Sequence, residues 1–386
     1  MKVLFMAWDI YDDTNTLPQF FQCCTGGSLV IKNICEYVGR KCESYLFIGK
    51  NKVPEMDLGN IHIIGTNMIP KIQDSSNETY LQTMATAFSD TLEKIKPDIV
   101  NIHGIGELAK QCIELCIAKG VPYVYTDHLY IGLNQHISGY ERHIEWEKKL
   151  YSINNLKIIV VSTGMKKKIL NDFPNIPEKN ISVVLNGTNF IAQKMDNNLK
   201  EFYSISSEKV LLCVGTLLAR KNQVQIVDAF RLLPPQLQQK IKILFCGLDR
   251  MEGYLQDRIT HYGLQDRLIY CGKSNNNDIK KYYSIADGLI VPSKAEGLSI
   301  AMLEAIAYGL PIIMFSDSEC ADDLNDKKVV CFSVDRSDQS LANAIIEWFE
   351  NDWDHNYIVQ YSKCFSMENV AMNYIDYYKR HISTEI

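Results

Sequence analysis

Two glutamates, Glu296 and Glu304, are the residues of this sequence whose type and spacing best suit chemistry. Seven residues lie between them. Glu304 falls within a run that is otherwise Ile, Ala, Met, Leu, Ala, Ile and Ala, and a carboxylate on such an apolar face needs a hydrogen-bonding partner. The alternative is an ordinary βαβ unit in which both glutamates are solvated.

The residues around this pair predict a strand, a loop, a helix and a second strand of a parallel sheet. The apolar run Gly288 to Val291 indicates a buried strand. Ser299 can cap a helix from Ile300 to Tyr308, and Ile312 to Met314 begin the next strand. Glu296 is therefore expected in the loop and Glu304 in the second turn of the helix.

The loop between these elements suits a phosphate. The backbone N–H groups of Gly297, Leu298 and Ser299 lie at the helix N-terminus, where unpaired donors and the helix dipole favour an anion. A diphosphate over these amides would leave Glu296 to reach hydroxyls on one side and Glu304 hydroxyls on the other. A nucleotide-sugar has that layout of sugar, diphosphate and ribose.

The whole stretch resembles the Glu-x7-Glu motif of the retaining GT-B glycosyltransferases of family four (glycosyl transferases group 1). The resemblance includes Pro292-Ser293 before the motif and Ala-x-x-x-Gly-x-Pro, ending at Pro311, after it. It implies an α/β fold of two Rossmann-like domains that face each other across a cleft. The donor would lie in that cleft, and the C-terminal helix would cross back onto the first domain.

The resemblance also implies cations for the donor diphosphate, in the segment that runs from a strand ending at Gly215 to Lys221. The family pattern is Gly-Arg-Leu, three further residues and Lys. Lys221 matches the lysine, but Thr216 stands where the family has arginine. Arg220 is the nearest substitute, and its alternative is a side chain that points to solvent.

Relatives read the edge of the donor base near the end of the strand that Leu268 to Gly272 predict. The resemblance therefore implies that Tyr270, Cys271 and Lys273 line the base pocket. Uracil is the base that the family favours.

In the first half, Val3 to Ala7 predict a strand, and Gly26-Gly27 precede a helical pattern that ends at Gly39. A strand, a glycine-rich turn and a helix can cradle a phosphate, and the alternative for two glycines alone is a simple tight turn. Members of the family carry a similar Gly-Gly where the loop approaches the donor phosphates.

Two histidines, His103 and His128, each stand where a predicted strand stops. Ligands of open α/β sheets bind at the carboxyl ends of strands. The alternative for either residue is a histidine that is hydrogen-bonded within its loop. Related enzymes use a histidine at one of these two strand ends, near the donor sugar and the acceptor, and the sequence leaves open which one acts here.

Two further segments bear on the acceptor. Residues 132 to 154 are polar and aromatic, with helical character from about Glu141, and suit either an acceptor pocket or a solvated helix. Lys166 to Lys168 lie beside Met165. Such a run is usually a solvated face, but it is compatible with a peripheral contact at the inner face of a membrane.

Composition agrees with a globular protein of 386 residues, 46% of them hydrophobic and 22% charged. The net charge of −6 argues against a general nucleic-acid binder. The twelve cysteines have no zinc-site spacing, and Cys112 and Cys116 suit a packed helix face. Without a signal peptide or a long apolar run, a cytoplasmic protein is expected.

We therefore expect an acceptor-binding domain over residues 1–190, a linker over 191–206, a nucleotide-sugar domain over 207–365 and a crossover helix over 366–386. The expected reaction is transfer of a sugar, with retention, from a nucleoside diphosphate to a glycan, lipid-linked or other hydroxyl acceptor. His103, His128, Lys221 and Glu296 are the expected catalytic residues, without metal or cofactor. The alternatives are a GT-B phosphorylase or epimerase, and a weakly active GT-B subunit that supports a partner enzyme.

Overall fold

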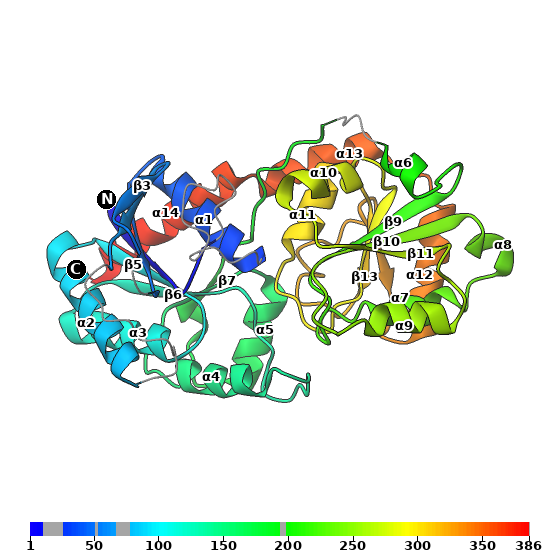
Figure 1. Ribbon diagram of the computed structural model, residues 1–386. Helices are drawn as coiled ribbons and strands as arrows, with labels where there is room; N and C mark the ends of the chain where they lie inside the picture. Colours follow the sequence, from blue (N-terminus) through cyan, green and yellow to red (C-terminus); the bar gives the residue numbers. More distant parts are fainter. Residues whose placement is uncertain (11–25, 51–52, 67–77, 194–197, 386) are drawn as a thin grey trace. The chain divides into compact units, whose positions relative to one another are not determined.

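The computed structural model describes residues 1–10, 26–50, 53–66, 78–193 and 198–385. These residues form two compact units. The first unit comprises Met1–His136, Tyr140–Gly187 and Met367–Ile386, and the second comprises Ile137–Gly139 and Thr188–Ser366. Each unit is built around one β-sheet with helices on its faces (Figure 1). The predicted α/β architecture with two Rossmann-like sheets is confirmed.

The sheet of the first unit has eight strands in the order β3-β4-β2-β1-β5-β6-β7-β8. All neighbours are parallel except the short pair of β3 and β4. The strands are β1 (Lys2–Ala7), β2 (Glu43–Ile48), β3 (Met56–Leu58), β4 (Ile61–Ile64), β5 (Ile99–His103), β6 (Tyr123–Asp127), β7 (Ile158–Val160) and β8 (Ile181–Val183). β3 was not predicted, because three residues show too little alternation to mark a strand.

The helices of the first unit cover both faces of its sheet. They are α1 (Gly26–Gly39), α2 (Glu78–Ile95), α3 (Glu107–Lys119), α4 (Glu141–Tyr151), α5 (Thr163–Asp172), the 3-10 helix η2 (Glu178–Asn180) and the C-terminal α14 (Met367–Glu385). α1 packs against α14, and α2 packs against α3 (Figure 1). Cys112 and Cys116 are fully buried on α3, as expected for a packed face.

The sheet of the second unit is wholly parallel, in the order β11-β10-β9-β12-β13-β14. This is the doubly wound order, in which the chain moves outward from β9 in one direction and then from β12 in the other. The strands are β9 (Lys209–Val214), β10 (Ile241–Cys246), β11 (Leu268–Gly272), β12 (Gly288–Val291), β13 (Ile312–Phe315) and β14 (Val330–Ser333).

One face of this second sheet carries the main core of the unit. Apolar side chains of α7, α9 and α12 pack there against the strands, and the tryptophan Trp348 is among the largest buried side chains. The helices are α6 (Leu199–Phe202), α7 (Val224–Phe230), α8 (Pro235–Gln238), α9 (Tyr254–His261), α10 (Asn276–Tyr283), α11 (Ile300–Ala307), α12 (Asp338–Glu350), α13 (His355–Ser362) and the 3-10 helix η3 (Lys363–Phe365).

A buried polar chain ties α14 to the sheet of the first unit. Asn101 of β5 donates through Nδ2 to the hydroxyl of Tyr378 at 2.7 Å, and Thr126 of β6 donates to Asn101 Oδ1 at 2.7 Å. All three side chains are fully buried. Because α14 comes last in the chain, these bonds join the C-terminus to the strands that end at His103 and next to His128.

We expect Tyr378→Phe to lower the free energy of unfolding by about 1–3 kcal/mol, because it leaves the Asn101 amide buried without an acceptor. Tyr37→Phe is the matched control, since the half-buried Tyr37 has no hydrogen bond from its hydroxyl in the described residues. Urea unfolding followed by tryptophan fluorescence measures both. Equal effects of the two substitutions would contradict this account of α14.

Candidate functional site

In the second unit the order in which the chain adds strands reverses between β9 and β12, which are parallel, hydrogen-bonded neighbours. Ligands of doubly wound sheets bind at the carboxyl ends of the strands beside this reversal. The loop after β9 carries Arg220 and Lys221, and the loop after β12 carries Glu296. Topology alone therefore brings these residues to the same edge of the sheet.

Glu296 receives both cations on one oxygen. Lys221 Nζ forms an ion pair with Glu296 Oε2, and Arg220 Nη1 lies 3.2 Å from the same atom. The hydroxyl of Ser293 lies 3.3 Å from it. Burial alone would raise the pKa of Glu296, but the charges of Lys221 and Arg220 outweigh it and lower the pKa to about 2. The carboxylate is thus charged at neutral pH.

Arg220 is a buried member of this cluster, with 8% of its surface exposed. Its Nη1 also donates to the carbonyl oxygen of Ala295 at 2.5 Å. The alternative in which Arg220 points to solvent is therefore wrong, because its guanidinium closes the loop that carries Glu296. Thr216 contributes its carbonyl oxygen, which accepts from Gln223 at 3.1 Å.

The N-terminus of α11 lies directly after Glu296. Ser299 is the N-cap residue, as predicted, but its side chain makes no capping hydrogen bond, so that part of the prediction is wrong. The backbone N–H groups of Gly297 and Ser299 likewise donate to no group in the described part of the chain. The first turn of α11 therefore keeps unpaired donors, as an anion site requires.

Glu304 has the partner that its apolar surroundings demand. It is 6% exposed, and the hydroxyl of Tyr283 donates to its Oε2 at 2.8 Å. Burial raises the pKa of Glu304 to about 7, although the bond from Tyr283 and the charge of Lys280 act in the opposite direction. Oε1 has no partner within the described ranges, so it remains free to accept from a ligand hydroxyl.

Three backbone turns meet beside this cluster at the carboxyl ends of β9, β10 and β11. A side chain at Gly247 would lie 2.0 Å from the carbonyl oxygen of Gly215, so the close approach of the two loops requires glycine. The Gly247 N–H donates to Gly272 O at 2.9 Å. The hydroxyl of Tyr270 donates to Gly247 O at 2.9 Å and holds this turn.

The other residues expected at the donor base differ in their surroundings. Cys271 is half-buried, and hydrogen bonds with Cys246, Tyr203 and Tyr282 lower the pKa of its thiol. Lys273 is exposed. Tyr270 packs its ring against the core cluster. All lie at the end of β11, and their contact with a base stays a prediction.

The first unit brings the two histidines together. His103 Nδ1 lies 2.9 Å from His128 Nε2, and the rings stack with centroids 5.2 Å apart. Burial lowers the pKa of both rings, that of His128 to about 4, so the pair is neutral at pH 7. His103 Nε2 and His128 Nδ1 are buried without partners in the described residues. Because the two rings are in contact, a role for either histidine would involve both.

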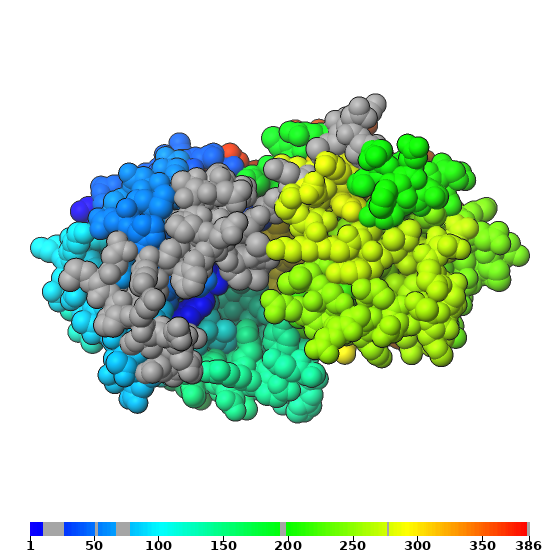
Figure 2. Space-filling view, in the orientation of Figure 1, coloured from blue at the N-terminus to red at the C-terminus, as the bar shows by residue number. Residues whose placement is uncertain are grey.

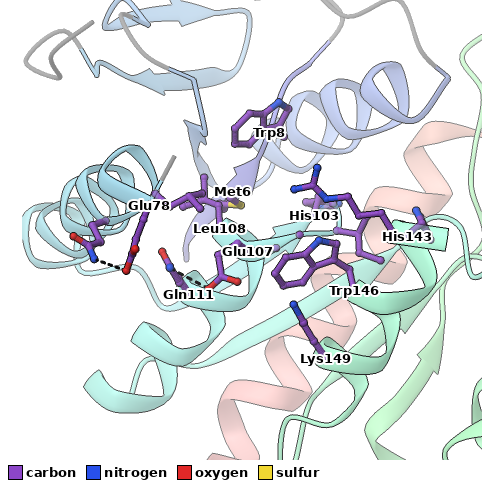
Figure 3. A pocket seen from close by; sticks show the side chains of 17 residues that line it. Met6, Trp8, Glu78, His103, Glu107, Leu108, Gln111, His143, Trp146 and Lys149 are labelled. Carbon is purple, nitrogen blue, oxygen red and sulfur yellow. Dashed lines mark hydrogen bonds between the residues drawn. The ribbon is translucent and has the colours of Figure 1, made fainter. Parts of the chain in front are cut away.

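His103 lines a pocket of about 730 Å³ in the first unit (Figure 3). The pocket lies at the carboxyl ends of β1 and β5, which are neighbours at the reversal of that sheet. Its walls come from the ends of β1 and β5, from α2 and α3, and from α4 through Arg142, His143, Trp146 and Lys149. Of the two alternatives for this segment, a purely solvated helix does not hold for α4, because Arg142, His143, Trp146 and Lys149 line the pocket.

Buried carboxylates fix α4 beside His128. Glu147 is fully buried and accepts from the backbone N–H groups of Ile131 at 2.5 Å and Gly132 at 3.0 Å. Asp127 accepts from the hydroxyl of Tyr151. Sequence reasoning missed these residues. The signal for Glu147 was present, because it falls on the same helical face as Leu150 and Tyr151.

Two other predictions meet different outcomes. Gly26 and Gly27 begin α1 instead of forming a turn before it, and residues 11–25 of the preceding loop lie outside the described residues. A side chain added at Gly27 would meet no atom within 4 Å in the described chain, so packing against the described residues does not require glycine there. Lys166 forms an ion pair with Glu178 at 3.1 Å, which leaves membrane contact by this run a prediction.

The described chain shows no group of three or more His, Cys, Asp or Glu side chains that could hold a metal ion. None of the helices in the described ranges is both long enough and apolar enough to cross a bilayer.

Comparisons with known proteins match both halves of the chain. Residues 25–190 match the family Glycosyltransferase Family 4, and residues 194–364 match Glycosyl transferases group 1. An uncharacterized glycosyltransferase of Methanocaldococcus jannaschii is 26% identical over 246 residues, which are 60% of this chain and 61% of the relative. The chain spans between 47% and 61% of the length of the first curated relatives that it matches.

Solved structures share the fold over nearly the whole chain. Sucrose-phosphate synthase of Thermosynechococcus elongatus superposes with a TM-score of 0.76 at 16% identity, covering 99% of both chains. HepE of Anabaena, in complex with UDP-glucose, superposes with a TM-score of 0.71 at 15% identity, covering 100% of both chains.

The opposite pKa shifts of Glu304 and Glu296 predict opposite effects of pH on stability. The folded-state pKa of Glu304, about 7, exceeds its unfolded value of about 4.3, so its contribution to stability falls as pH rises through that window. Glu304→Gln removes this loss. We expect the difference in melting temperature, Glu304→Gln minus the unsubstituted protein, to increase by several degrees from pH 5 to pH 8.

Glu296→Gln is the counterpart. Its charged form stabilises the fold above the unfolded pKa and loses that effect as pH falls toward about 2. The variant should therefore melt lower at pH 7, with a deficit that shrinks toward pH 3. Differential scanning calorimetry across this range checks both variants, and parallel curves for the two would contradict the assignment.

Proposed function

Because the chain belongs to the GT-B glycosyltransferases of family four, we propose that it transfers a sugar from a nucleoside diphosphate donor to a hydroxyl acceptor with retention of configuration. The observation that carries this proposal is the meeting of Lys221, Arg220 and Glu296 beside the unpaired amides of α11. A diphosphate is the group that this arrangement of two cations and free N–H donors suits best.

The proposed chemistry places the leaving diphosphate against Lys221 and Arg220. Negative charge builds on the diphosphate as the glycosidic bond breaks, and preorganised cations stabilise it most in the transition state. Glu296 would release these cations to the diphosphate and accept from hydroxyls of the donor sugar. Because two cations and helix amides can balance this charge, the proposed reaction needs no metal.

Glu304 is proposed to accept from the ribose hydroxyls through Oε1, while Tyr283 holds Oε2. UDP is the proposed donor nucleotide, and the similar Anabaena structure in complex with UDP-glucose supports it. Tyr270, Cys271 and Lys273 are proposed to line the base, and Gly26 and Gly27 to approach the donor phosphates. The proposed acceptor is a glycan or a lipid-linked sugar.

A thermal-shift panel of UDP-, GDP- and ADP-sugars tests the donor, because a ligand that binds only the folded state raises its melting temperature. UDP-sugars should give the largest shift. Donor hydrolysis by the same preparation then separates an enzyme from a GT-B subunit that merely supports a partner. The absence of both a nucleotide-dependent shift and hydrolysis would overturn the proposal.

We expect Glu304→Ala to weaken UDP binding by about tenfold or more, because it leaves ribose hydroxyls unpaired. Glu296→Gln should not weaken UDP binding, since UDP lacks the sugar and since Lys221 and Arg220 lose a competing carboxylate. Isothermal titration calorimetry with UDP measures both variants. Unchanged affinity of Glu304→Ala would remove the ribose role.

We expect Lys221→Ala to reduce turnover by a factor on the order of a hundred, the usual scale for one preorganised electrostatic contact. Arg220→Ala should be similarly impaired, because Arg220 shares the Glu296 oxygen and supports Ala295. Lys240→Ala is the control, because Lys240 is exposed and directly precedes β10, at the opposite end of that strand from the site loops. Near-normal donor turnover by Lys221→Ala would remove the diphosphate role from this loop.

A further inference from the structure

The pocket of the first unit has two chemically different sides. Glu78 of α2 and Glu107 of α3 lie on one side, and Trp146 and Lys149 of α4 lie on the other (Figure 3). The acidic side chains already accept hydrogen bonds from Gln82 at 3.4 Å and Gln111 at 3.1 Å. A ligand that fits this pocket must therefore present different groups to its two walls.

The α4 wall of the pocket carries positive charge. Arg142 and Lys149 both line the pocket, and neither forms an ion pair in the described part of the chain. The ammonium group of Lys149 lies 4.1 Å from the centre of the Trp146 ring. His143 also lines this wall, but its Nε2 lies 3.2 Å from Oε1 of the buried Glu147, so any charge on it already has a partner.

Backbone donors lie between the two walls. The N–H groups of Gly104, Ile105 and Gly106 make no hydrogen bond within the described ranges. Gly104 and Gly106 have φ of 91° and 135°, so the loop turns in a way that glycine permits and that can aim successive amides at one point. The loop leads into α3, whose N-cap residue is Gly106.

A buried side chain with an unpaired nitrogen lines the same pocket as these donors. His103 is 1% exposed, lines the pocket and keeps Nε2 without a partner among the described residues. A buried nitrogen without a partner costs free energy unless a ligand or water satisfies it. Gln111 Oε1, on the acidic side, is likewise buried and unpaired there.

We propose that this pocket binds the acceptor through an anionic group, a carboxylate or a phosphate, held by the Gly104–Gly106 amides, His103, Arg142 and Lys149. The inference rests on the proposed function, because it names the acceptor of that reaction. The ring of the acceptor sugar packs on Trp146, and its hydroxyls donate to Glu78 and Glu107. An anionic group gains from the positive charges of Arg142 and Lys149, and a neutral glycan does not.

Both cations lie at the surface of α4, whose segment is visible on the face of the first unit drawn in Figure 2. Their replacement should therefore leave the fold intact. Lys148, the exposed neighbour of Lys149, does not line the pocket and supplies a control of equal charge on the same helix.

The test measures binding of glucuronate, glucose 6-phosphate and neutral glucose by calorimetry, with saturating UDP present to occupy the second unit. The two acids should bind at least about tenfold more tightly than glucose, since exposed charge-assisted bonds contribute modestly each and add together. The double variant Arg142→Gln/Lys149→Gln should abolish this preference, and Lys148→Gln should retain it. Far-UV circular dichroism confirms that the variants fold.

Three results would each overturn the inference. They are equal affinity for the acids and glucose, no saturable binding of either acid, and an equal loss of the preference for acids in Lys148→Gln and in the double variant. UDP titrations of the same variants keep the two proposals apart, because failure of UDP to bind counts against the donor and not against the pocket. Vesicles of phosphatidylglycerol and phosphatidylcholine distinguish the sources of the anion. Binding to phosphatidylglycerol that glucuronate displaces assigns the anion to a lipid headgroup, and its absence assigns it to a soluble glycan.

Discussion

The second unit depends on one shared carboxylate. Through Oε2, Glu296 of the loop after β12 holds Arg220 and Lys221 of the loop after β9. Two cations at this distance would repel each other in a buried site, and the loops would lose their common position. The carboxylate is itself costly to bury without them. Each of the three buried charges is therefore tolerated because the others are present. They meet because β9 and β12, which precede their two loops, are neighbours in the sheet.

Much of the second unit could be predicted from the sequence. Its strands are continuous apolar runs, as expected when helices cover both faces of a sheet, so β11 and β12 have the predicted limits. The Glu-x7-Glu spacing predicted a loop and a helix, and α11 carries Glu304 in its second turn. A carboxylate within an apolar run signalled a partner, although the run could not identify that partner as Tyr283.

What the sequence did not reveal are contacts between residues far apart in the chain. The bond between His103 and His128 depends on β5 and β6 being neighbours in the sheet. The burial of Arg220 depends on a carbonyl 75 residues away. Ser299 occupies the cap position without capping, because an N-cap preference describes a residue type and not the orientation of one side chain. The prediction that Gly26 and Gly27 form a turn before the helix was wrong, because the helix begins at Gly26 itself.

The two stacked histidines have a further consequence for the pocket. Their single hydrogen bond contains one hydrogen, so the tautomer of one neutral ring determines that of the other. When His103 donates through Nδ1, its Nε2 is an acceptor. When His128 donates instead, His103 Nε2 carries a hydrogen and is a donor. A shift of hydrogens along the pair therefore reverses the polarity of one buried atom at constant charge, and the pocket can match an oxyanion in one state and a hydroxyl hydrogen in the other.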